Sequence, residues 1–217
     1  MKLIGMLDSP YVRRTAISFQ LLGLNFEHQS LSVFSTFTDF QRINPVVKAP
    51  TLICEDGTLL MDSTLIIEYA EALARPRSLM PKEPRNLQHE LRVVGLALAV
   101  CEKSVQIIYE RNLRPTEKQH QPWVARVTDQ LLAAYGALEE EVSRQPLGVT
   151  SATMGQAGLT AAVAWHFTQQ MLPDVVQIGE FPTLATYSAI TETLPEFRAA
   201  PHGDGTFKSL LQRPGIF

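Results

Sequence analysis

The segment DSPYVRR, residues 8–14, places a hydroxyl group where a strand is expected to end and a helix to begin. Ser9 is a favourable N-cap residue, because its hydroxyl accepts a hydrogen bond from a backbone N–H that the first helical turn leaves without a partner. Pro10 suits the first helical position, where its missing N–H costs nothing. A hydroxyl beside the positive end of a helix is also well placed to bind an anion. The segment therefore has two interpretations, a plain helix cap and an anion-binding serine.

Asp62 and Ser63 form a second pair of this kind, directly before an apolar helical repeat. A helix that begins here offers free backbone N–H groups and a positive dipole to a carboxylate, and the serine adds a hydroxyl. The aspartate adds negative charge that attracts an ammonium group. An ordinary N-cap is the alternative interpretation of this pair. Ahead of it, Pro50 opens a strand-like run, and proline is tolerated at the first residue of a strand.

The elements that hold these side chains follow the order of a βαβ unit and a hairpin. We expect a strand, a helix, a second strand and a hairpin at residues 2–7, 10–22, 25–33 and 51–61, and then a second helix that has Asp62 or Ser63 as its cap and carries Leu65, Tyr69 and Leu73. Gly23 is the expected end of the first helix, since glycine adopts the left-handed conformation of a C-cap easily. The letters EDG at residues 55–57 predict the tight turn of the hairpin.

A change of pattern marks a domain boundary after the first eighty residues. Residues 74–85 contain three prolines and five charges, a composition typical of a linker. Beyond it the periodicity predicts helices alone, at about 87–112, 116–144, 153–171 and 182–194. Thr153 and Gln156 have the spacing of a capping box at the start of the third helix. We assign residues 1–76 to an α/β domain, 77–86 to a linker and 87–217 to an all-α domain.

Composition excludes several function classes. The net charge of −3 gives no field that would attract nucleic acid or an anionic membrane surface. The sequence lacks an apolar run of membrane-spanning length and a signal peptide, so we expect a cytoplasmic protein. Its two cysteines form no CxxC pair, which fits a reducing compartment. The five histidines lack metal-ligand spacing, so no metal site is predicted.

Three motifs together resemble the glutathione transferase superfamily, in particular its serine-type members and small bacterial transferase-like proteins. They are SPYVRR (9–14), NPVVKAPTL (44–52) and LMDSTLIIEYAE (60–71). The resemblance implies a thioredoxin-like N-terminal domain followed by a C-terminal helical bundle. It also implies a homodimer that uses glutathione as co-substrate and needs no metal.

The resemblance implies a role for each residue of the second and third motifs. The bond before Pro50 would be a cis peptide bond, which turns the backbone of Ala49 outward to bind the cysteinyl part of glutathione like an added strand. Asp62 and Ser63 would bind the γ-glutamyl end. Lys48 would face the glycyl carboxylate or be solvated.

Ser9 would donate a hydrogen bond to the sulfur of glutathione. Only the thiolate is a good nucleophile, and a free thiol has a pKa near 8.5. A charge-assisted hydrogen bond worth about 1.5–3 kcal/mol, together with the helix end, would lower this pKa by roughly one to two units. The hydroxyl acts as a donor and not as a nucleophile. We expect Arg13 and Arg14 of the same motif to be solvated or in salt bridges; the alternative is that one of them adds positive potential to the site.

The electrophile is expected between the two domains in such proteins. Tyr109 and Arg111 are candidate contacts from the helical domain, and Tyr11 is either a packing aromatic or a further contact. The sequence thus predicts a glutathione transferase that conjugates the thiolate to a hydrophobic electrophile. Two alternatives stay open: a glutathione-dependent thiol-disulfide oxidoreductase or peroxidase, and a non-catalytic interaction module of the same fold.

Overall fold

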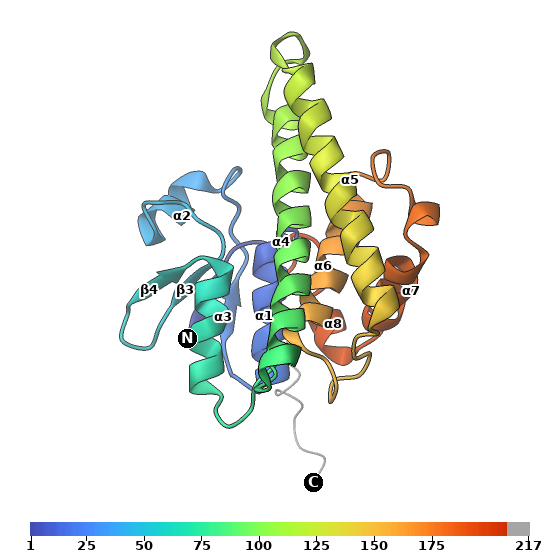
Figure 1. Ribbon diagram of the computed structural model, residues 1–217. Coiled ribbons are helices and arrows are strands. Elements are labelled where there is room, and N and C mark those ends of the chain that lie inside the picture. The colour runs from blue at the N-terminus through green and yellow to red at the C-terminus, as the bar shows by residue number, and fades with distance from the viewer. Residues whose placement is uncertain (208–217) are drawn as a thin grey trace. The chain divides into compact units, whose positions relative to one another are not determined.

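The computed structural model describes residues 1–207 and divides into two compact units (Figure 1). Of the described residues, the first unit contains 1–79 and 193–207, and the second contains 80–192. From the sequence, residues 193–207 were expected in the helical domain. It groups with the first unit because the short helix α8 (Pro195–Ala199) packs against α1 (Pro10–Leu22), with Phe197 fully buried.

A four-stranded mixed sheet forms the centre of the first unit, with the strand order β2–β1–β3–β4. The strands are β1 (Lys2–Ile4), β2 (Glu27–Gln29), β3 (Thr51–Ile53) and β4 (Leu59–Met61). β1 pairs in parallel with β2 and antiparallel with β3, and β4 adds an antiparallel edge. This is the expected thioredoxin-like topology, with a second strand that is shorter than its alternating pattern predicted.

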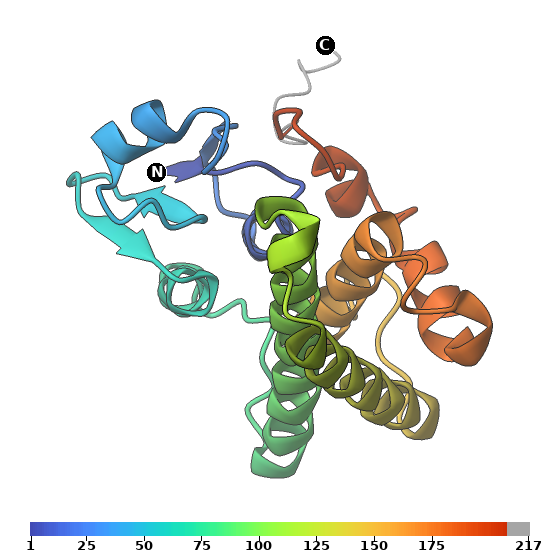
Figure 2. The ribbon, with the colours of Figure 1, turned by 90° about the horizontal axis from the view of Figure 1, so that it is seen from above.

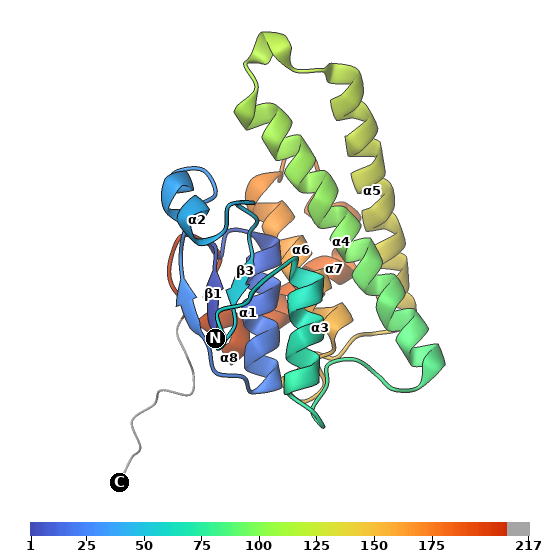
Figure 3. The same cartoon turned by 90° about the vertical axis from the view of Figure 1, so that its left-hand side faces the viewer.

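Helices α1 and α3 (Ser63–Leu73) lie side by side and pack on this sheet, as Figures 1 and 3 show. Figure 2 views both helices nearly end-on, which makes the helical layer easy to distinguish from the strands. Helix α1 has the predicted bounds and ends at Gly23, which adopts the left-handed conformation with φ of 74°. The connection whose form the sequence did not predict contains α2 (Phe37–Ile43).

The hairpin between β3 and β4 is also confirmed. The backbone N–H of Cys54 donates to the carbonyl of Thr58 at 2.9 Å. Gly57 occupies the turn with φ of 84°, a conformation that strongly favours glycine. The hairpin ends at β4, and the chain enters α3 directly, so the position of the turn determines where Asp62 and Ser63 lie.

The second unit is helical, with its main helices at α4 (Pro84–Leu113), α5 (Gln121–Arg144), α6 (Gln156–Met171) and α7 (Pro182–Thr191). Helix α4 packs against both α5 and α6. Helix α6 is buried on every side over residues 156–165, as expected for a helix that is apolar around its circumference. Among residues 1–207, no helix has both the length and the hydrophobicity that a membrane span requires.

The start of α6 differs from the predicted capping box. Gly155 is the N-cap, and Thr153 hydrogen-bonds within its own turn. Instead, the carboxylate of Glu90 on α4 accepts from the backbone N–H of Ala157 at 2.6 Å. A carboxylate from a neighbouring helix therefore satisfies a backbone donor that the local sequence was expected to satisfy.

Candidate glutathione site

The turn between β1 and α1 is tightly packed. Gly5 has φ of 135°, and a Cβ atom at this position would lie 2.6 Å from Val12 Cγ2 and 3.3 Å from the Cβ of Ala49. Ser9 follows as the N-cap of α1, and its Oγ accepts from the backbone N–H of Val12 at 3.5 Å. This hydrogen bond is long, so it holds the hydroxyl weakly. Ser9 is thus a helix cap whose O–H can still donate to another group.

The loop that carries Ala49 is held by the buried side chain of Asn44. Its Nδ2 donates to Thr51 Oγ1 at 2.8 Å, and its Oδ1 accepts from the backbone N–H of Val46 at 3.0 Å. The hydroxyl of Thr51 in turn donates to the carbonyl of Lys48 at 2.6 Å. The peptide bond between Ala49 and Pro50 is cis, as the resemblance implied. These bonds fix the backbone of the loop beside the turn that contains Gly5.

The N-terminus of α3 brings two predicted site residues together. Asp62 is the N-cap, and its Oδ1 accepts from the backbone N–H of Thr64 at 2.9 Å. Its Oδ2 lies 4.0 Å from Nζ of Lys48. Ser63 is buried, with 1% of its surface exposed, whereas Thr64 is exposed. The result is an accessible helix N-terminus with an acidic and a basic side chain beside it.

Arg14 reaches this helix N-terminus from α1. Its Nη1 donates to Ser63 Oγ at 3.1 Å and to Thr64 Oγ1 at 3.3 Å. The neighbouring Arg13 points elsewhere: its Nε donates to the carbonyl of Ala200 at 2.8 Å. Both arginines are buried, so the expectation that they are solvated is wrong.

A signal for this burial was present in the sequence. Helix α1 carries apolar residues on nearly every side, so its charged residues cannot all reach solvent. The sequence contains no signal that predicts which residues the two arginines contact, because Ser63 and Ala200 are far from them in the chain.

Residues 3–78 match the sequence profile of the glutathione S-transferase N-terminal domain. The uncharacterized GST-like protein YibF of Escherichia coli is 23% identical over 173 residues, which cover 80% of this chain and 85% of that protein. A glutathione S-transferase from Methylobacterium radiotolerans, solved in complex with glutathione sulfonate, superposes with a TM-score of 0.84 at 23% identity, covering 92% and 93% of the two chains. A glutathione transferase family member from Pseudomonas fluorescens Pf-5, solved with bound glutathione, superposes with a TM-score of 0.79 at 24% identity. The match covers 92% of this chain and 97% of that chain.

The chain has the glutathione S-transferase fold. The family match itself covers residues 3–78, the thioredoxin-like part of the chain. Within this transferase fold, Ser9, Lys48, Ala49, Pro50, Asp62 and Ser63 all belong to the first unit, the thioredoxin-like part.

Two titratable side chains flank the β1–α1 turn of the transferase fold. Burial raises the pKa of the Asp8 carboxyl, a hydrogen bond from the backbone of Ser9 lowers it, and the negative charge of Asp204 raises it further. Burial lowers the pKa of His28, whose Nδ1 accepts from the backbone N–H of Phe207 at 2.9 Å. The imidazole is therefore the neutral tautomer with hydrogen on Nε2, which donates to the carbonyl of Gly5 at 2.7 Å.

The chain's own thiols are poor candidates for chemistry in this fold. Neither Cys54 nor Cys101 is in a disulfide, and both are buried. Burial raises the pKa of the Cys54 thiol, and the charge of Asp56 raises it further. A thiol with a raised pKa holds little thiolate at neutral pH and is a weak nucleophile.

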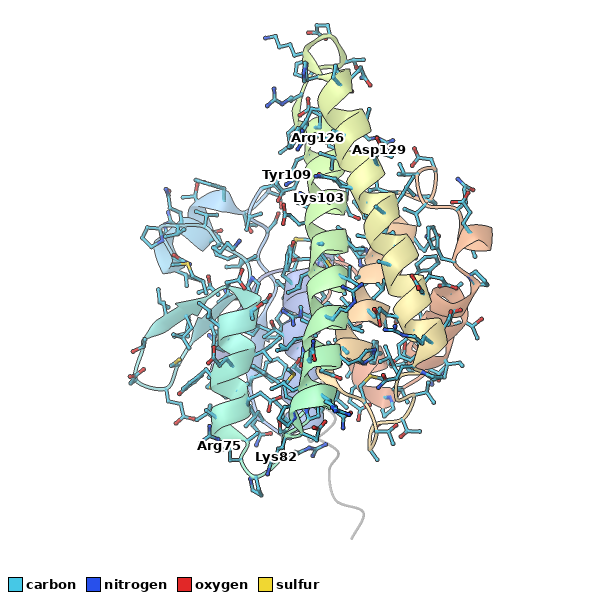
Figure 4. All side chains as sticks on the ribbon, viewed as in Figure 1. Arg75, Lys82, Lys103, Tyr109, Arg126 and Asp129 are labelled. Atoms are coloured by element: carbon cyan, nitrogen blue, oxygen red, sulfur yellow. The ribbon has the colours of Figure 1, made fainter. Side chains whose placement is uncertain are left out.

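Tyr109 and Arg111, the two candidate electrophile contacts on α4, do not form one cluster. Tyr11 is half-buried on α1, and Tyr109, 42% exposed, extends from α4, where Figure 4 labels it near Lys103. Arg111 makes two contacts with Asp174, at 3.2 Å and 2.9 Å. Residues two positions apart on a helix face different sides, so Tyr109 and Arg111 do not share a surface of α4.

Within the described part of the chain, no group of three or more histidine, cysteine, aspartate or glutamate side chains could hold a metal ion. The polar groups that do converge are hydroxyls, one carboxylate and two basic side chains. This set suits a zwitterionic organic ligand.

Proposed function

We propose that the protein is a serine-type glutathione transferase, which binds glutathione on its first unit and conjugates the thiolate to a hydrophobic electrophile. The observation that carries this proposal is the arrangement at the start of α3, where Lys48 and Asp62 lie 4.0 Å apart beside the hydroxyls of Ser63 and Thr64. Solved relatives of the same fold hold glutathione or glutathione sulfonate.

Glutathione carries an ammonium and a carboxylate on its γ-glutamyl residue, and the proposed contacts match both. The α-carboxylate accepts from the N–H groups and hydroxyl at Ser63, where the helix dipole favours negative charge. The ammonium group pairs with Asp62, and Lys48 adds positive charge for the carboxylates. The backbone N–H and C=O of Ala49, before Pro50, pair with the cysteinyl part like an additional strand.

Ser9 is the proposed catalytic residue. Its O–H donates to the glutathione sulfur and stabilises the thiolate, which is charged, more than the thiol, which is neutral. The positive end of α1 acts in the same direction. The thiolate then attacks the electrophile and forms the thioether bond. In a substitution the leaving group departs with the electron pair of the broken bond; in an addition or ring opening a carbon or oxygen of the electrophile takes up that pair and is then protonated by water. No second protein nucleophile is needed, which agrees with the buried state of both cysteines.

The electrophile pocket is the least specified part of the proposal. Tyr109 is the contact that we favour, because its ring is exposed on α4, and Tyr11 is a second contact from α1. Arg111 is already engaged by Asp174, so a role for it requires that this pair opens. A panel of aromatic halides, epoxides, enones and organic peroxides would define the reaction class.

Isothermal calorimetry with reduced glutathione tests the proposed function directly. We expect the wild-type protein to bind with micromolar-to-millimolar affinity, Asp62→Ala to lose binding, and Ser9→Ala to keep it. Absence of binding to the wild-type protein, confirmed by a competition assay with S-hexylglutathione, would overturn the proposal and favour the non-catalytic interaction module.

A homodimer is part of the proposal. Leu65, Tyr69 and Leu73 follow one another at intervals of four residues along α3, and all three are exposed. Leu59 and Met61 of the adjacent strand β4 add further exposed apolar side chains. An exposed apolar row of this kind marks an interaction surface. A second copy of the chain is the proposed occupant.

Sedimentation velocity tests the dimer. Leu65→Glu places a charge in the apolar row, at its most exposed residue, and should convert the dimer to a monomer. Ile178→Glu is the control, because Ile178 is similarly exposed (59% against 57%) but lies outside the row. A wild-type monomer, or equal effects of both substitutions, would contradict the assignment. A cytoplasmic location stays a prediction, supported by the free thiols of Cys54 and Cys101.

A further inference from the structure

Residues 200–207, which we call the C-terminal strap, are attached to strand β2 and the residue after it. The hydroxyl of Ser30 donates to the backbone carbonyl of Asp204 at 2.7 Å. Further along the strap, the backbone N–H of Phe207 donates to Nδ1 of His28 at 2.9 Å. The end of the described chain is therefore held by side chains that lie more than 170 positions away in the sequence.

His28 connects this strap to the turn that carries Ser9. Its second ring nitrogen, Nε2, donates at 2.7 Å to the carbonyl of Gly5, a buried residue directly after β1. We propose that His28 is a positioning residue, which uses its contact with the strap to hold the β1–α1 turn so that the hydroxyl of Ser9 faces the sulfur of glutathione. This role rests on the proposed function, because it concerns the thiolate that Ser9 would stabilise.

The strap determines which nitrogen of the imidazole donates to the turn. A neutral imidazole has one N–H donor and one acceptor nitrogen, and the hydrogen bond at one nitrogen fixes the tautomer. Because the N–H of Phe207 occupies Nδ1, the hydrogen lies on Nε2, from which it reaches Gly5. Burial lowers the pKa of His28, which favours the neutral ring that this arrangement requires. The hydrogen bond to the strap therefore supports the hydrogen bond to the turn.

The turn's own hydrogen bonds hold Ser9 only weakly. The cap bond from the N–H of Val12 to Ser9 Oγ is 3.5 Å long, and the N–H of Ser9 donates to the carbonyl of Met6 at 3.2 Å. Gly5, with φ of 135°, is at the start of the turn. Glycine has the widest range of backbone conformations, so the direction of its carbonyl depends on the donor that holds it. His28 provides this donor from outside the turn.

Two substitutions of His28 separate positioning from a general effect on the fold. His28→Leu removes both hydrogen bonds, whereas His28→Gln keeps one acceptor and one donor on the side chain. In the complex with glutathione, His28→Leu should raise the pKa of the glutathione thiol by about one unit, which reduces the thiolate at pH 7 up to about tenfold. The Kd for glutathione should stay within about twofold of wild type, because the proposed ammonium and carboxylate contacts are unchanged. His28→Gln should restore the low thiol pKa.

Substitutions of Phe207 separate the backbone N–H of the strap from its ring. The ring stacks on Phe26, with 4.5 Å between the ring centres. Phe207→Pro removes the N–H and the ring, whereas Phe207→Leu removes the aromatic stack and keeps the N–H. We expect the thiol pKa to rise in Phe207→Pro, as in His28→Leu, and to stay at the wild-type value in Phe207→Leu. This pair provides the same test if His28→Leu does not fold.

Ser30→Ala is the control for stability. It releases the carbonyl of Asp204 and leaves the hydrogen bond between His28 and Phe207 in place. We expect a lower unfolding temperature and an unchanged thiol pKa. An equal rise of the thiol pKa in Ser30→Ala and His28→Leu would overturn the inference, since it would indicate a general loss of stability. A wild-type thiol pKa in His28→Leu would overturn it as well.

Hydrogen exchange in the protein without ligand distinguishes failure of this role from failure of the proposed function. The backbone N–H of Ser9 should exchange about tenfold faster in His28→Leu and Phe207→Pro than in wild type, and at the wild-type rate in Phe207→Leu. Equal rates in wild type and His28→Leu would show that His28 does not hold the turn. If wild type binds no glutathione, the proposed function fails, whatever the exchange rates are.

Discussion

Asp62 has two contacts at once: Oδ1 accepts the backbone N–H of Thr64 at 2.9 Å, and Oδ2 lies 4.0 Å from Nζ of Lys48. The first contact caps α3. The second holds a basic side chain from the loop before β3 beside the start of that helix. One carboxylate therefore links the two motifs, NPVVKAPTL and LMDSTLIIEYAE, that the sequence places apart.

Replacing Asp62 should affect binding and stability in different amounts. Asp62→Ala removes an N-cap, which costs about 1 kcal/mol of unfolding free energy. It also removes the proposed partner of the ammonium group, so the Kd for glutathione should rise about tenfold or more. Urea unfolding and calorimetry measure the two effects. Asp56→Ala is the control, because Asp56 makes the same kind of bond, to the N–H of Thr58, in the hairpin; an equal rise in its Kd would contradict the assignment.

Replacing Ser9 should change the thiol and not the affinity. The ultraviolet absorbance of the thiolate, followed against pH in the binary complex, should give a glutathione pKa that is roughly one to two units higher in Ser9→Ala than in wild type. Turnover at pH 7 should fall about tenfold to a hundredfold for the same reason. Ser9→Thr, which keeps the hydroxyl, is expected to retain a low pKa. Identical titrations of wild type and Ser9→Ala would refute the proposed role.

Glu90 should be important for the stability of the helical unit. Its carboxylate accepts from the N–H of Ala157, which is fully buried at the start of α6. Glu90→Ala leaves this donor unsatisfied and should lower the unfolding free energy by about 1–3 kcal/mol. Glu140→Ala, at an exposed position of α5, should have an effect below about 0.5 kcal/mol. Similar unfolding midpoints for the two variants would show that the capping contact is unimportant.

His28 should make stability depend on pH in the mildly acidic range. Burial lowers its pKa in the folded state below the ordinary value of 6.5. The unfolded chain therefore binds the proton more readily, and stability is fully present above that value and is lost as the pH falls through the folded pKa. Urea unfolding should show a steeper loss between about pH 7 and pH 5 in wild type than in His28→Gln. Parallel curves would contradict this.

Asp8 should contribute to the pH dependence of stability with the opposite sign to His28. Burial and the charge of Asp204 raise its pKa in the folded state above 3.8, so the folded chain binds the proton more readily than the unfolded chain. The ionised carboxylate is therefore unfavourable at neutral pH, and this penalty disappears as the pH falls through the folded pKa. Asp8→Asn should have a higher unfolding temperature than wild type at pH 7, with the difference shrinking in acid. A lower unfolding temperature of Asp8→Asn at pH 7 would refute this prediction.

Local signals explain why much of the first unit could be predicted from the sequence. Ser9, Pro10 and Gly23 mark the two ends of α1, and the structure has the helix at the predicted residues 10–22. The turn at residues 55–57 was predicted in the same way, and of the two predicted caps, Asp62 and Ser63, the structure has Asp62. Each of these features depends on hydrogen bonds and backbone conformations within a few residues, which residue type determines directly.

Contacts between distant residues were decided only by the tertiary structure. Arg14 meets Ser63 across 49 positions, Glu90 meets Ala157 across 67, and Arg13 meets Ala200 across 187. A charged residue near the start of a helix predicts a solvated side chain, unless the helix is buried on several sides, as α1 is. The sequence by itself determined where α1 and the hairpin begin and end. Packing determined which buried polar groups form hydrogen bonds with one another. A buried donor needs an acceptor, and only the tertiary structure determines which acceptor lies within reach.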